Sequence, residues 1–400
     1  MARAIRVLAI MEAAFVSGPA KNLIEFAQCA RAAEEGLPAL EFTVVSYQRG
    51  AEDSPNPFVV AARSAGIAVD IVYERARFDL SVLAQLKAIV AARNPEIIQT
   101  HNVKSHFLMR VSGLWRTHCW IAFQHGYTAT DFKMRCYNQL DRWSLRVPRH
   151  VVAVCESFAA ELAGRGVNRR RITVRHNSIK PFPRLAPGVT EGIRKTLPSP
   201  PTGILLSVGR LSGEKGHIDL IRALGLLRRE WPEDEFHLLL VGEGPERSRI
   251  EAARAEEGLE DRVTLTGLQR DVGPYYGIAD VVVIPSHSEG SPNALLEAMI
   301  AGTPVVATRA GGIPEIVVHE ETAILVGIRD AEGLATAIHR LLHDPEKRRR
   351  LGEKAKMVAR TEYSPEAYRQ SLGRLYAQVL EGRVAEPQPI ARKTPRSIRP

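Results

Sequence analysis

Several features that define common protein classes are missing from this chain of 400 residues. Its four cysteines (Cys29, Cys119, Cys136 and Cys155) form no C-x-x-C pair and no metal-binding spacing, which indicates reduced thiols and argues against a disulfide framework. No run of about 18 apolar residues occurs, so we expect no transmembrane helix. Because Glu12 interrupts the apolar N-terminal stretch, that stretch predicts a strand and not a signal peptide. We therefore expect a cytoplasmic protein.

Familiar nucleotide-binding signatures are also missing. The chain has neither the G-x-x-x-x-G-K-[ST] of a Walker loop nor the G-x-G-x-x-G fingerprint, which disfavours a nicotinamide or flavin dinucleotide. RNP, helix-turn-helix and zinc-finger patterns are absent as well. A nucleic-acid-binding module is thus an alternative that only the charge of the chain supports.

Positive charge is concentrated in one part of the chain. The formal net charge is +9; residues 1–190 carry 25 Lys/Arg against 15 Asp/Glu, whereas residues 191–380 carry 24 against 28. Residues 110–184 alone carry 14 against 4. This excess predicts contact with a phosphate-rich surface, either nucleic acid or anionic lipid.

Short apolar runs alternate with amphipathic segments along both halves of the chain. In the first half we expect strands at Arg6–Ile10, Phe42–Tyr47, Val69–Tyr73, Ile97–Thr100, Trp120–Gln124, Val151–Val154 and Ile172–Arg175, with helices at Leu23–Glu34 and Leu80–Arg93. In the second half we expect strands at Ile204–Val208, Phe236–Val241, Val263–Thr266, Asp280–Pro285, Pro304–Ala307 and Ala323–Val326, with helices that begin near His217, Pro245, Val272, Pro292, Ile313 and Ala331. Continuous Val/Ile/Leu runs of this kind are typical of parallel sheets covered on both faces.

The expected fold is therefore α/β, with two tandem Rossmann-like domains that face a cleft and bind ligands at the carboxyl ends of their strands. We expect an N-terminal domain at 1–185, a proline-rich linker at 186–201 and a second domain at 202–362. A C-terminal helix at 363–382 is expected to cross back to the first domain, followed by a disordered tail at 383–400.

A glycine-rich loop follows the first strand of the second half. It carries two cations, Arg210 and Lys215, after Gly209. Two cations at a strand end suit a bound phosphate, although a solvated loop with incidental charges explains them equally well. Gly242 and Gly267 end the next two strands, where each either lets the backbone approach a ligand or makes a tight turn.

The stretch SEGSPNALLEAM, residues 288–299, holds two glutamates around a predicted helix start. Ser291 suits the N-cap and Pro292 the first helical position, which leaves the N–H groups of 290–294 available to an anion. Glu289 and Glu297 then suit the hydroxyl groups of a sugar or a ribose. The alternative is that Glu297 faces solvent and Glu289 caps a turn.

Taken in order, these motifs resemble the retaining family 4 glycosyltransferases of GT-B fold over residues 200–380. The resemblance lies in Gly209-Arg210 with Lys215-Gly216, Gly242-x-Gly244, Gly267, the E-x7-E of Glu289 and Glu297, 302–306 and 311–315. The first half is similar more loosely, through 17–20, 100–105 and 124–126. Three departures, Ser17-Gly18, 177–180 and 320–324, leave the hinge and the acceptor side open.

The resemblance implies a role for each site residue. Arg210 and Lys215 would bind the diphosphate of a nucleotide-sugar and stabilise the leaving group without a metal. Glu297 would accept the ribose hydroxyls, Glu289 would hold the donor sugar, and His125 would face that sugar from the first domain. The remaining substrate-binding residues implied are Gly18, His101, Gly209, Gly242, Gly267, Gly290, Ser291, Pro292 and Asn293.

The function implied is retaining transfer of a sugar from a UDP- or GDP-sugar to a lipid-linked glycan or a cell-surface polysaccharide precursor, with no cofactor and no nucleic acid. The alternatives are a sugar-nucleotide epimerase of the same fold and a non-catalytic sugar-nucleotide binder. Residues 114–149 interleave aromatic and basic side chains, which suits an anionic membrane surface and a peripheral location on the cytoplasmic face of the inner membrane. Alternatively, these aromatics fill the core and the arginines are solvated.

Overall fold

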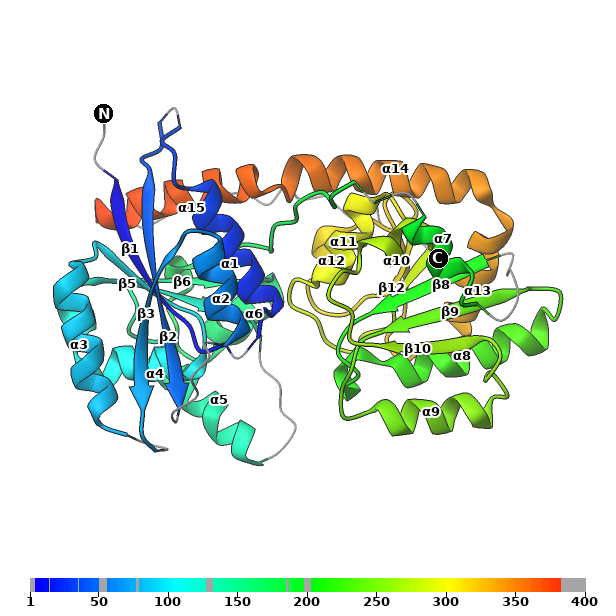
Figure 1. Ribbon diagram of the computed structural model, residues 1–400, viewed down its shortest axis with the longest axis horizontal. Coiled ribbons are helices and arrows are strands. Elements are labelled where there is room, and N and C mark those ends of the chain that lie inside the picture. The colour runs from blue at the N-terminus through cyan, green and yellow to red at the C-terminus, as the bar shows by residue number, and fades with distance from the viewer. Residues whose placement is uncertain are drawn as a thin grey trace. The chain divides into compact units, whose positions relative to one another are not determined.

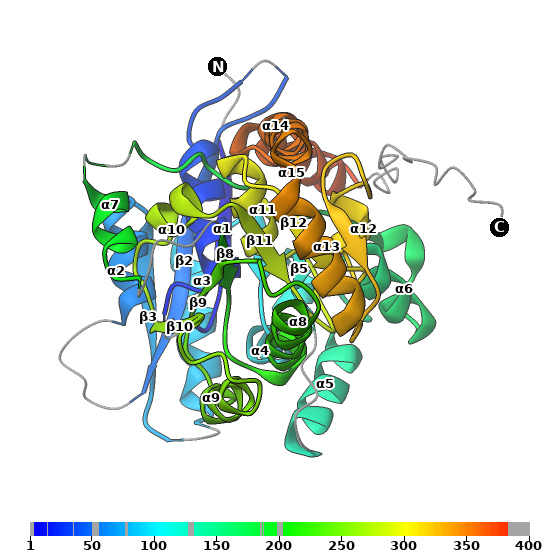
Figure 2. The ribbon, with the colours of Figure 1, turned by 90° about the vertical axis from the view of Figure 1, so that its right-hand side faces the viewer.

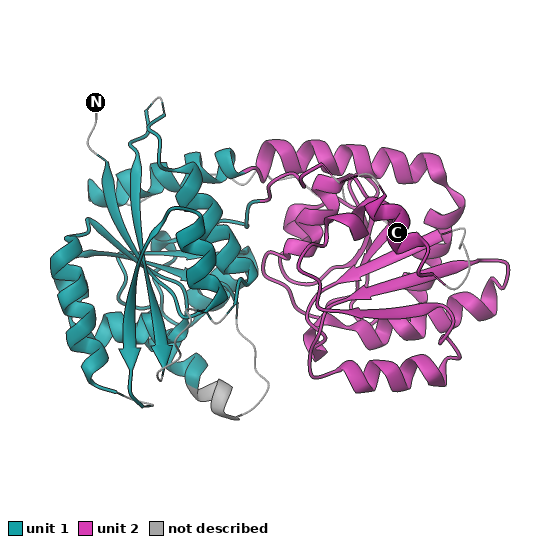
Figure 3. Cartoon of the chain, in the orientation of Figure 1, with its two compact units in different colours: residues 1–178, 365–400 teal, residues 179–364 magenta. Residues whose placement is uncertain are grey.

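The computed structural model describes residues 4–382 apart from 14, 35, 50–55, 77–78, 127–131, 185, 187 and 198–202, with the backbone alone at 132–136. The chain divides into two compact units (Figure 3). Unit 1 contains residues 1–178 and 365–400, and unit 2 contains residues 179–364. No helix among the described residues combines the length and the apolar character that crossing a membrane requires.

Unit 1 is built on a seven-stranded parallel sheet of order β3-β2-β1-β4-β5-β6-β7 (Figure 1). The strands are β1 (Ile5–Ile10), β2 (Leu40–Arg49), β3 (Ala68–Glu74), β4 (Ile97–Thr100), β5 (Cys119–Gln124), β6 (His150–Ala153) and β7 (Ile172–Val174). The helices are α1 (Gly18–Cys29), α2 (Pro57–Ser64), α3 (Ser81–Arg93), α4 (Val103–Ser112), α5 (Phe132–Ser144), α6 (Glu156–Gly164) and α15 (Pro365–Leu380).

The apolar strands of unit 1 bury side chains on both faces. In β1, Val7 joins a core cluster that contains Phe26 of α1, whereas Leu8 joins a second cluster that contains Leu86 of α3. Alternation along a strand sends successive side chains to opposite faces, so both faces need a helical cover. The final helix α15 shares the cover of the first face, where the rings of Tyr376 and Phe26 meet edge-on at 6.1 Å.

Unit 2 repeats the scheme with a six-stranded parallel sheet of order β10-β9-β8-β11-β12-β13. The strands are β8 (Gly203–Val208), β9 (Phe236–Val241), β10 (Val263–Gly267), β11 (Val281–Ile284), β12 (Val305–Thr308) and β13 (Ile324–Val326). The helices are α7 (Val189–Arg194), α8 (His217–Glu230), α9 (Arg247–Glu256), α10 (Gly273–Ile278), α11 (Asn293–Ala301), α12 (Ile313–Ile316), α13 (Ala331–His343) and α14 (Pro345–Glu362). One core cluster lies under α8, α9 and α13, and α10, α11 and α14 cover the other (Figure 2).

In each sheet the first strand of the unit lies beside its fourth, β1 beside β4 and β8 beside β11. The connections run in opposite directions from this point, so the loops that follow the two strands separate and leave a crevice at their carboxyl ends. Every strand that the sequence predicts is present within two residues of its expected ends, and the predicted two-domain parallel α/β fold is confirmed.

Several helices differ from the expectation, and α1 and α14 show why. Helix α1 begins at Gly18 instead of Leu23, because Pro19 fits the first helical turn. Helix α14 is not among the predicted helices, although its 18 residues bury Leu351, Ala355 and Ala359 at a spacing of four. Its many charged residues conceal that stripe in the sequence.

The proline-rich segment after unit 1 packs on unit 2. Ile179 and Leu197 belong to a core cluster of unit 2, and the Phe182 ring stacks on Tyr276 at 5.4 Å. Unit 2 accordingly begins at Ile179, before the linker expected at 186–201, because these apolar side chains anchor the segment. Residues 198–201, the proline-rich end of the expected linker, and the expected tail at 383–400 lie outside the described residues. Among the described residues, Cys29, Cys119 and Cys155 form no disulfide, and the side chain of Cys136 lies outside the description.

Candidate functional site

The crevice at the carboxyl ends of β8 and β11 gathers charged groups in unit 2. Lys215 Nζ lies 2.7 Å from Glu289 Oε1, and the Ser286 hydroxyl donates to the same oxygen at 2.7 Å. The Glu289 side chain is 8% exposed and that of Lys215 is 26% exposed. The structure therefore brings together two residues that the sequence separates by 74 positions. The alternative in which Glu289 merely caps a solvated turn does not fit a carboxylate that is buried and paired with a lysine.

Glycines explain how the backbone comes so close together at this edge. A Cβ on Gly311 would lie 1.8 Å from the Glu289 carbonyl oxygen, which accepts the Gly312 N–H at 3.1 Å. A Cβ on Gly242, where φ is +148°, would lie 1.8 Å from the Gly209 oxygen. Any side chain at these two positions would push the site loops apart.

Helix α11 follows Glu289 and starts at Asn293, one residue later than expected. Pro292 is the N-cap, with φ −70° and ψ 118°, and Asn293 is the first helical residue. The expectation that Ser291 caps and Pro292 opens the helix is therefore wrong by one position, because the ψ of Pro292 is extended and not helical. Ser291 is buried, at 8% exposure. The first N–H groups of α11 point toward the crevice edge at which Gly290 lies.

Glu297 lies in the second turn of α11 and is buried at 8% exposure. The Tyr276 hydroxyl of α10 donates to its Oε2 at 3.1 Å. Burial and the neighbouring Glu297 carboxylate raise the pKa of Tyr276 well above its usual value, so the hydroxyl keeps its proton. The alternative of a solvent-facing Glu297 is wrong.

Arg210 and Gly267 stand apart from these contacts. Arg210 is exposed, and no ion pair of its guanidinium occurs among the described residues. Gly267 ends β10 with φ +73°, where a Cβ would meet Glu243 Oε1 at 3.1 Å. Neither residue touches the Lys215–Glu289 pair through a described hydrogen bond.

Two predicted histidines meet at the carboxyl ends of β4 and β5 in unit 1. His101 Nδ1 lies 3.1 Å from His125 Nε2, and the two rings are parallel to within 10°. His101 is 7% exposed and also stacks on Phe123 at 4.7 Å. Burial lowers the pKa of His125 to about 4 and the pKa of His101 well below its usual value, so both rings are neutral at pH 7.

A chain of hydrogen bonds fixes the tautomers of this pair. The Tyr376 hydroxyl of α15 donates to Gln99 Oε1, and Gln99 Nε2 faces His101 Nε2 at 2.7 Å. Since His101 Nε2 accepts, its proton lies on Nδ1 and is donated to His125 Nε2. His125 then carries its own proton on Nδ1, a buried atom without a described partner. A buried N–H donor of this kind suits a substrate oxygen.

Gly18 and Gly126 lie in the segments that follow β1 and β5 of unit 1. Gly18 opens α1 after the loop that follows β1. Gly126 has φ +116°, and a Cβ there would lie 2.7 Å from the Phe158 ring, so the turn after His125 requires glycine.

Sequence reasoning missed several residues that hold the predicted ones. Tyr276 and Ser286 bind the two glutamates, and Gln99 and Tyr376 orient the histidines. His217, which opens α8 next to Lys215, is buried with Nδ1 unpartnered, and burial lowers its pKa to about 4. Of these residues, only His217 could have been found from the sequence, because it directly follows the glycine-rich loop.

Among the described residues, one group has the ligand atoms of a metal site, Asp234 with His339 and His343. Asp234 precedes β9 and thus lies at the amino edge of the sheet, opposite the crevice. The crevice residues themselves form no such group within the described part of the chain.

The basic, aromatic segment 114–149 is divided between core and surface. Trp120 and Phe123 are buried, as the core alternative expects, while Trp143 is 43% exposed. Arg110 lies 3.5 Å above the Trp143 ring, and Arg142 pairs with Glu161. Tyr127 and the side chains of Phe132, Lys133 and Arg135 lie outside the described residues.

Comparison with known proteins agrees with this arrangement. Residues 190–358 match the model of the glycosyl transferases group 1, and residues 26–178 match that of the glycosyl transferase 4-like domain. The lipopolysaccharide core biosynthesis glycosyltransferase LpsD of Rhizobium meliloti is 37% identical over 41% of this chain and 46% of its own. The 2-deoxystreptamine glucosyltransferase of Streptomyces kanamyceticus is 34% identical over 52% and 54%. The aligned part thus spans about half the length of these relatives.

A solved structure shares the fold over nearly the whole chain. HepE of Anabaena, crystallised with UDP-glucose, is 19% identical with a TM-score of 0.79, over 94% of this chain and 100% of that one. Together, the two family matches cover both units described above. The chain belongs to the group 1, family 4 glycosyltransferases and has the two parallel-sheet α/β domains of the GT-B fold.

Proposed function

We propose that this protein is an enzyme that transfers a sugar, with retention of configuration, from a UDP- or GDP-sugar to an acceptor hydroxyl. The observation that carries the proposal is the partly buried Lys215–Glu289 pair beside the first turn of α11. A cation, a carboxylate and a helix N-terminus in one crevice match the diphosphate and the hydroxyls of a nucleotide-sugar. The UDP-glucose in the HepE crystal supports a nucleotide-sugar donor, and the names of the relatives support sugar transfer.

Lys215 is proposed to serve both the sugar and the diphosphate. An ammonium group has three donors, and Glu289 uses one of them at 2.7 Å. The others are directed to phosphate oxygens, where Lys215 and Arg210 neutralise the charge that develops on the departing diphosphate. Glu289 Oε1 accepts from Lys215 and Ser286, which leaves Oε2 for the sugar hydroxyls. Glu297, held by Tyr276, accepts the ribose hydroxyls.

The proposed chemical step breaks the bond between the anomeric carbon and the diphosphate oxygen and forms a bond from that carbon to the acceptor oxygen on the same face. The acceptor proton passes to the departing phosphate, so no group of the chain changes protonation overall. The neutral His125 donates its Nδ1–H to an oxygen of the transferred sugar. Because the cations of the chain neutralise the diphosphate, we propose that turnover requires neither a metal nor a cofactor.

The deciding experiment is a donor screen on the full chain that follows nucleoside diphosphate release with UDP-, GDP- and ADP-sugars. We expect release with one base class and an undiminished rate in EDTA. An epimerase would convert the donor without release, and a non-catalytic binder would be stabilised by nucleotide without turnover. Thermal stabilisation by oligonucleotides alone would reject the proposal in favour of nucleic-acid binding.

We further propose that the acceptor is lipid-linked and that unit 1 rests on the cytoplasmic face of an anionic membrane. The supporting surface, here the α4–α5 patch, combines exposed apolar with basic side chains: Val111, Leu140, Trp143, Arg110 and Arg146. Arg110 covers the exposed indole of Trp143, and desolvation, with a smaller effect of the Arg146 charge, lowers the pKa of Arg110. Such a pairing of indole and arginine suits the headgroup region. The role of LpsD in lipopolysaccharide core synthesis fits a lipid-linked acceptor.

Vesicle sedimentation tests this surface. Wild-type protein is expected to sediment with phosphatidylglycerol vesicles and to be released by salt, whereas Trp143→Ala combined with Arg146→Ala should reduce binding about tenfold. Val60→Ala with Arg63→Ala, on α2, is the matched control because Val60 is also exposed, at 48%. Equal binding to neutral and anionic vesicles, or none, would reject the membrane proposal.

A further inference from the structure

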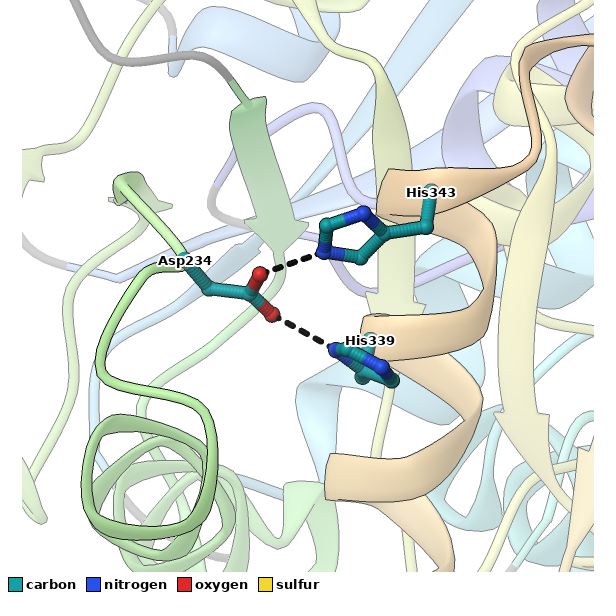
Figure 4. A group of neighbouring side chains, drawn as sticks. All are labelled: Asp234, His339 and His343. Carbon is teal, nitrogen blue, oxygen red and sulfur yellow. Dashed lines mark hydrogen bonds and ion pairs between the residues drawn. The ribbon is translucent and has the colours of Figure 1, made fainter.

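A second group of reactive side chains lies at the amino edge of the unit 2 sheet. Asp234 lies in the loop between α8 and β9, and His339 and His343 lie on the last turns of α13 (Figure 4). Residues four apart on a helix share one face, so both rings point toward the same carboxylate. Parallel strands begin at one edge of a sheet and end at the other, so this group is separate from the crevice described above.

The geometry of the group is compact and partly enclosed. Asp234 Oδ2 lies 2.9 Å from His339 Nδ1, and Asp234 Oδ1 lies 2.6 Å from His343 Nε2. The exposed fractions of the three side chains are 2% for Asp234, 25% for His339 and 55% for His343. The carboxylate is thus the buried base of the group, and His343 closes it toward solvent.

The surroundings hold the His339 ring and the backbone of Asp234 in place. The Trp231 ring stacks on His339 at 4.3 Å with an angle of 13° between the planes. The Asp234 N–H donates to the Trp231 carbonyl at 3.0 Å, and Arg262 donates to the Asp234 carbonyl at 3.0 Å. His343, by contrast, is exposed and has room to adjust.

We propose that Asp234, His339 and His343 bind a divalent transition-metal ion of the zinc class. All three ligand atoms lie within 4.8 Å of one another. Tetrahedral Zn²⁺ with bonds of about 2.0–2.1 Å separates its ligand atoms by about 3.3 Å. In the structure each imidazole contacts a different oxygen of the carboxylate, at 2.9 and 2.6 Å, so the bound ion replaces these two hydrogen bonds and the imidazoles shift until both nitrogens face it. Water on the side of His343 completes the coordination.

The ligand set selects the class of ion. Two imidazoles and one carboxylate suit Zn²⁺, Co²⁺ or Ni²⁺, whereas Mg²⁺ and Ca²⁺ prefer oxygen ligands throughout. The bound ion joins the end of α13 to the loop before β9, two segments that are 105 residues apart in sequence. It therefore acts on the stability of unit 2 and not on the chemistry at its carboxyl edge.

The test uses the full chain, treated with EDTA and desalted, then titrated with ZnCl₂ by calorimetry and by thermal unfolding. Because the chain has 12 histidines, variants must locate the site. We expect one saturable equivalent of Zn²⁺ and a higher melting temperature. Asp234→Asn and His343→Ala should each lower the affinity at least about 100-fold, since loss of a second-shell partner alone costs 10–100-fold.

Arg340→Ala is the matched control, because Arg340 lies between the two histidines on α13 but pairs with Glu320. Its Zn²⁺ affinity should equal that of the wild type. Co²⁺ should give the intense visible absorption of a four-coordinate ion in the wild type and lose it in His343→Ala. The proposal is overturned if the wild type shows no saturable binding or if His343→Ala, an exposed substitution that leaves folding intact, binds Zn²⁺ as tightly as the wild type.

Discussion

The two units share one strand order around their first strand, yet the side chains at their carboxyl edges differ in charge. Unit 2 presents an ion pair, Lys215 with Glu289, and a buried carboxylate, Glu297. Unit 1 presents two histidines that burial keeps neutral. Sheet topology therefore fixes where ligands bind, whereas the residues after each strand decide which charge is bound.

The largest expected effect is that of Lys215→Ala, which removes the cation from the charged edge of unit 2. Removal of a preorganised charge from a departing group costs about 10²–10³ in kcat, or about 2.7–4 kcal/mol. Steady-state release of nucleoside diphosphate measures the loss. Lys195→Ala, an exposed lysine of the same unit, should keep the wild-type rate. A Lys215→Ala enzyme with more than a third of that rate would remove Lys215 from the proposed mechanism.

The buried, neutral histidines of unit 1 predict a loss of stability in acid. Burial lowers the pKa values of His125 and His150 in unit 1 to about 4, below the value of about 6.5 expected in the unfolded chain. Between these values the unfolded chain binds more protons, so the free energy of unfolding falls as the pH falls from 6.5 to 4. Each group contributes up to about 3 kcal/mol to that loss.

Urea unfolding at pH 7.0 and 4.5 measures this effect. His150 is remote from the proposed chemistry and bonds to Thr173 Oγ1 at 2.8 Å, so His150→Gln should reduce the stability lost between the two pH values. An unchanged loss would show that His150 titrates normally in the folded protein.

The substitution His125→Phe tests the hydrogen bond that is proposed between unit 1 and the substrate. The substitution removes the buried Nδ1–H donor and leaves a substrate oxygen unsatisfied, which costs about 1–3 kcal/mol, a loss of about fivefold to 150-fold in kcat/KM. His118→Phe, a half-buried histidine of the same unit, is the control and should change kcat/KM less than twofold. Equal kinetics for the two variants would contradict a contact between His125 and the substrate.

The smallest expected effect comes from Tyr276→Phe. Glu297 loses a hydrogen bond of 3.1 Å, worth about 1 kcal/mol, so the KM for the donor should rise about fivefold with little change in kcat. Tyr275→Phe is the adjacent control, because no described bond joins Tyr275 to Glu297. A larger fall in kcat than rise in KM would place Glu297 in the chemical step and not in binding.

The sequence carries the fold almost completely but the site only in part. Buried parallel strands are continuous apolar runs, so β4 and β9 were predicted with their observed ends. The stripe of α14 is hidden among basic residues and was missed. Glu289 and Glu297 were visible because each interrupts an apolar context, whereas the partners Ser286, Tyr276 and Gln99 were not. Such partners are ordinary residue types, and only the three-dimensional register of separate loops selects them.

Unit 1 is discontinuous, since α15 returns to it after all of unit 2. Tyr368, Leu372 and Tyr376 complete the core over α1, and the Tyr376 hydroxyl orients Gln99. During synthesis, therefore, unit 2 leaves the ribosome whole before unit 1 can close. A chain that stops before residue 365 would expose the apolar face of the unit 1 sheet. Stable folding of the N-terminal half therefore requires an intact C-terminal helix.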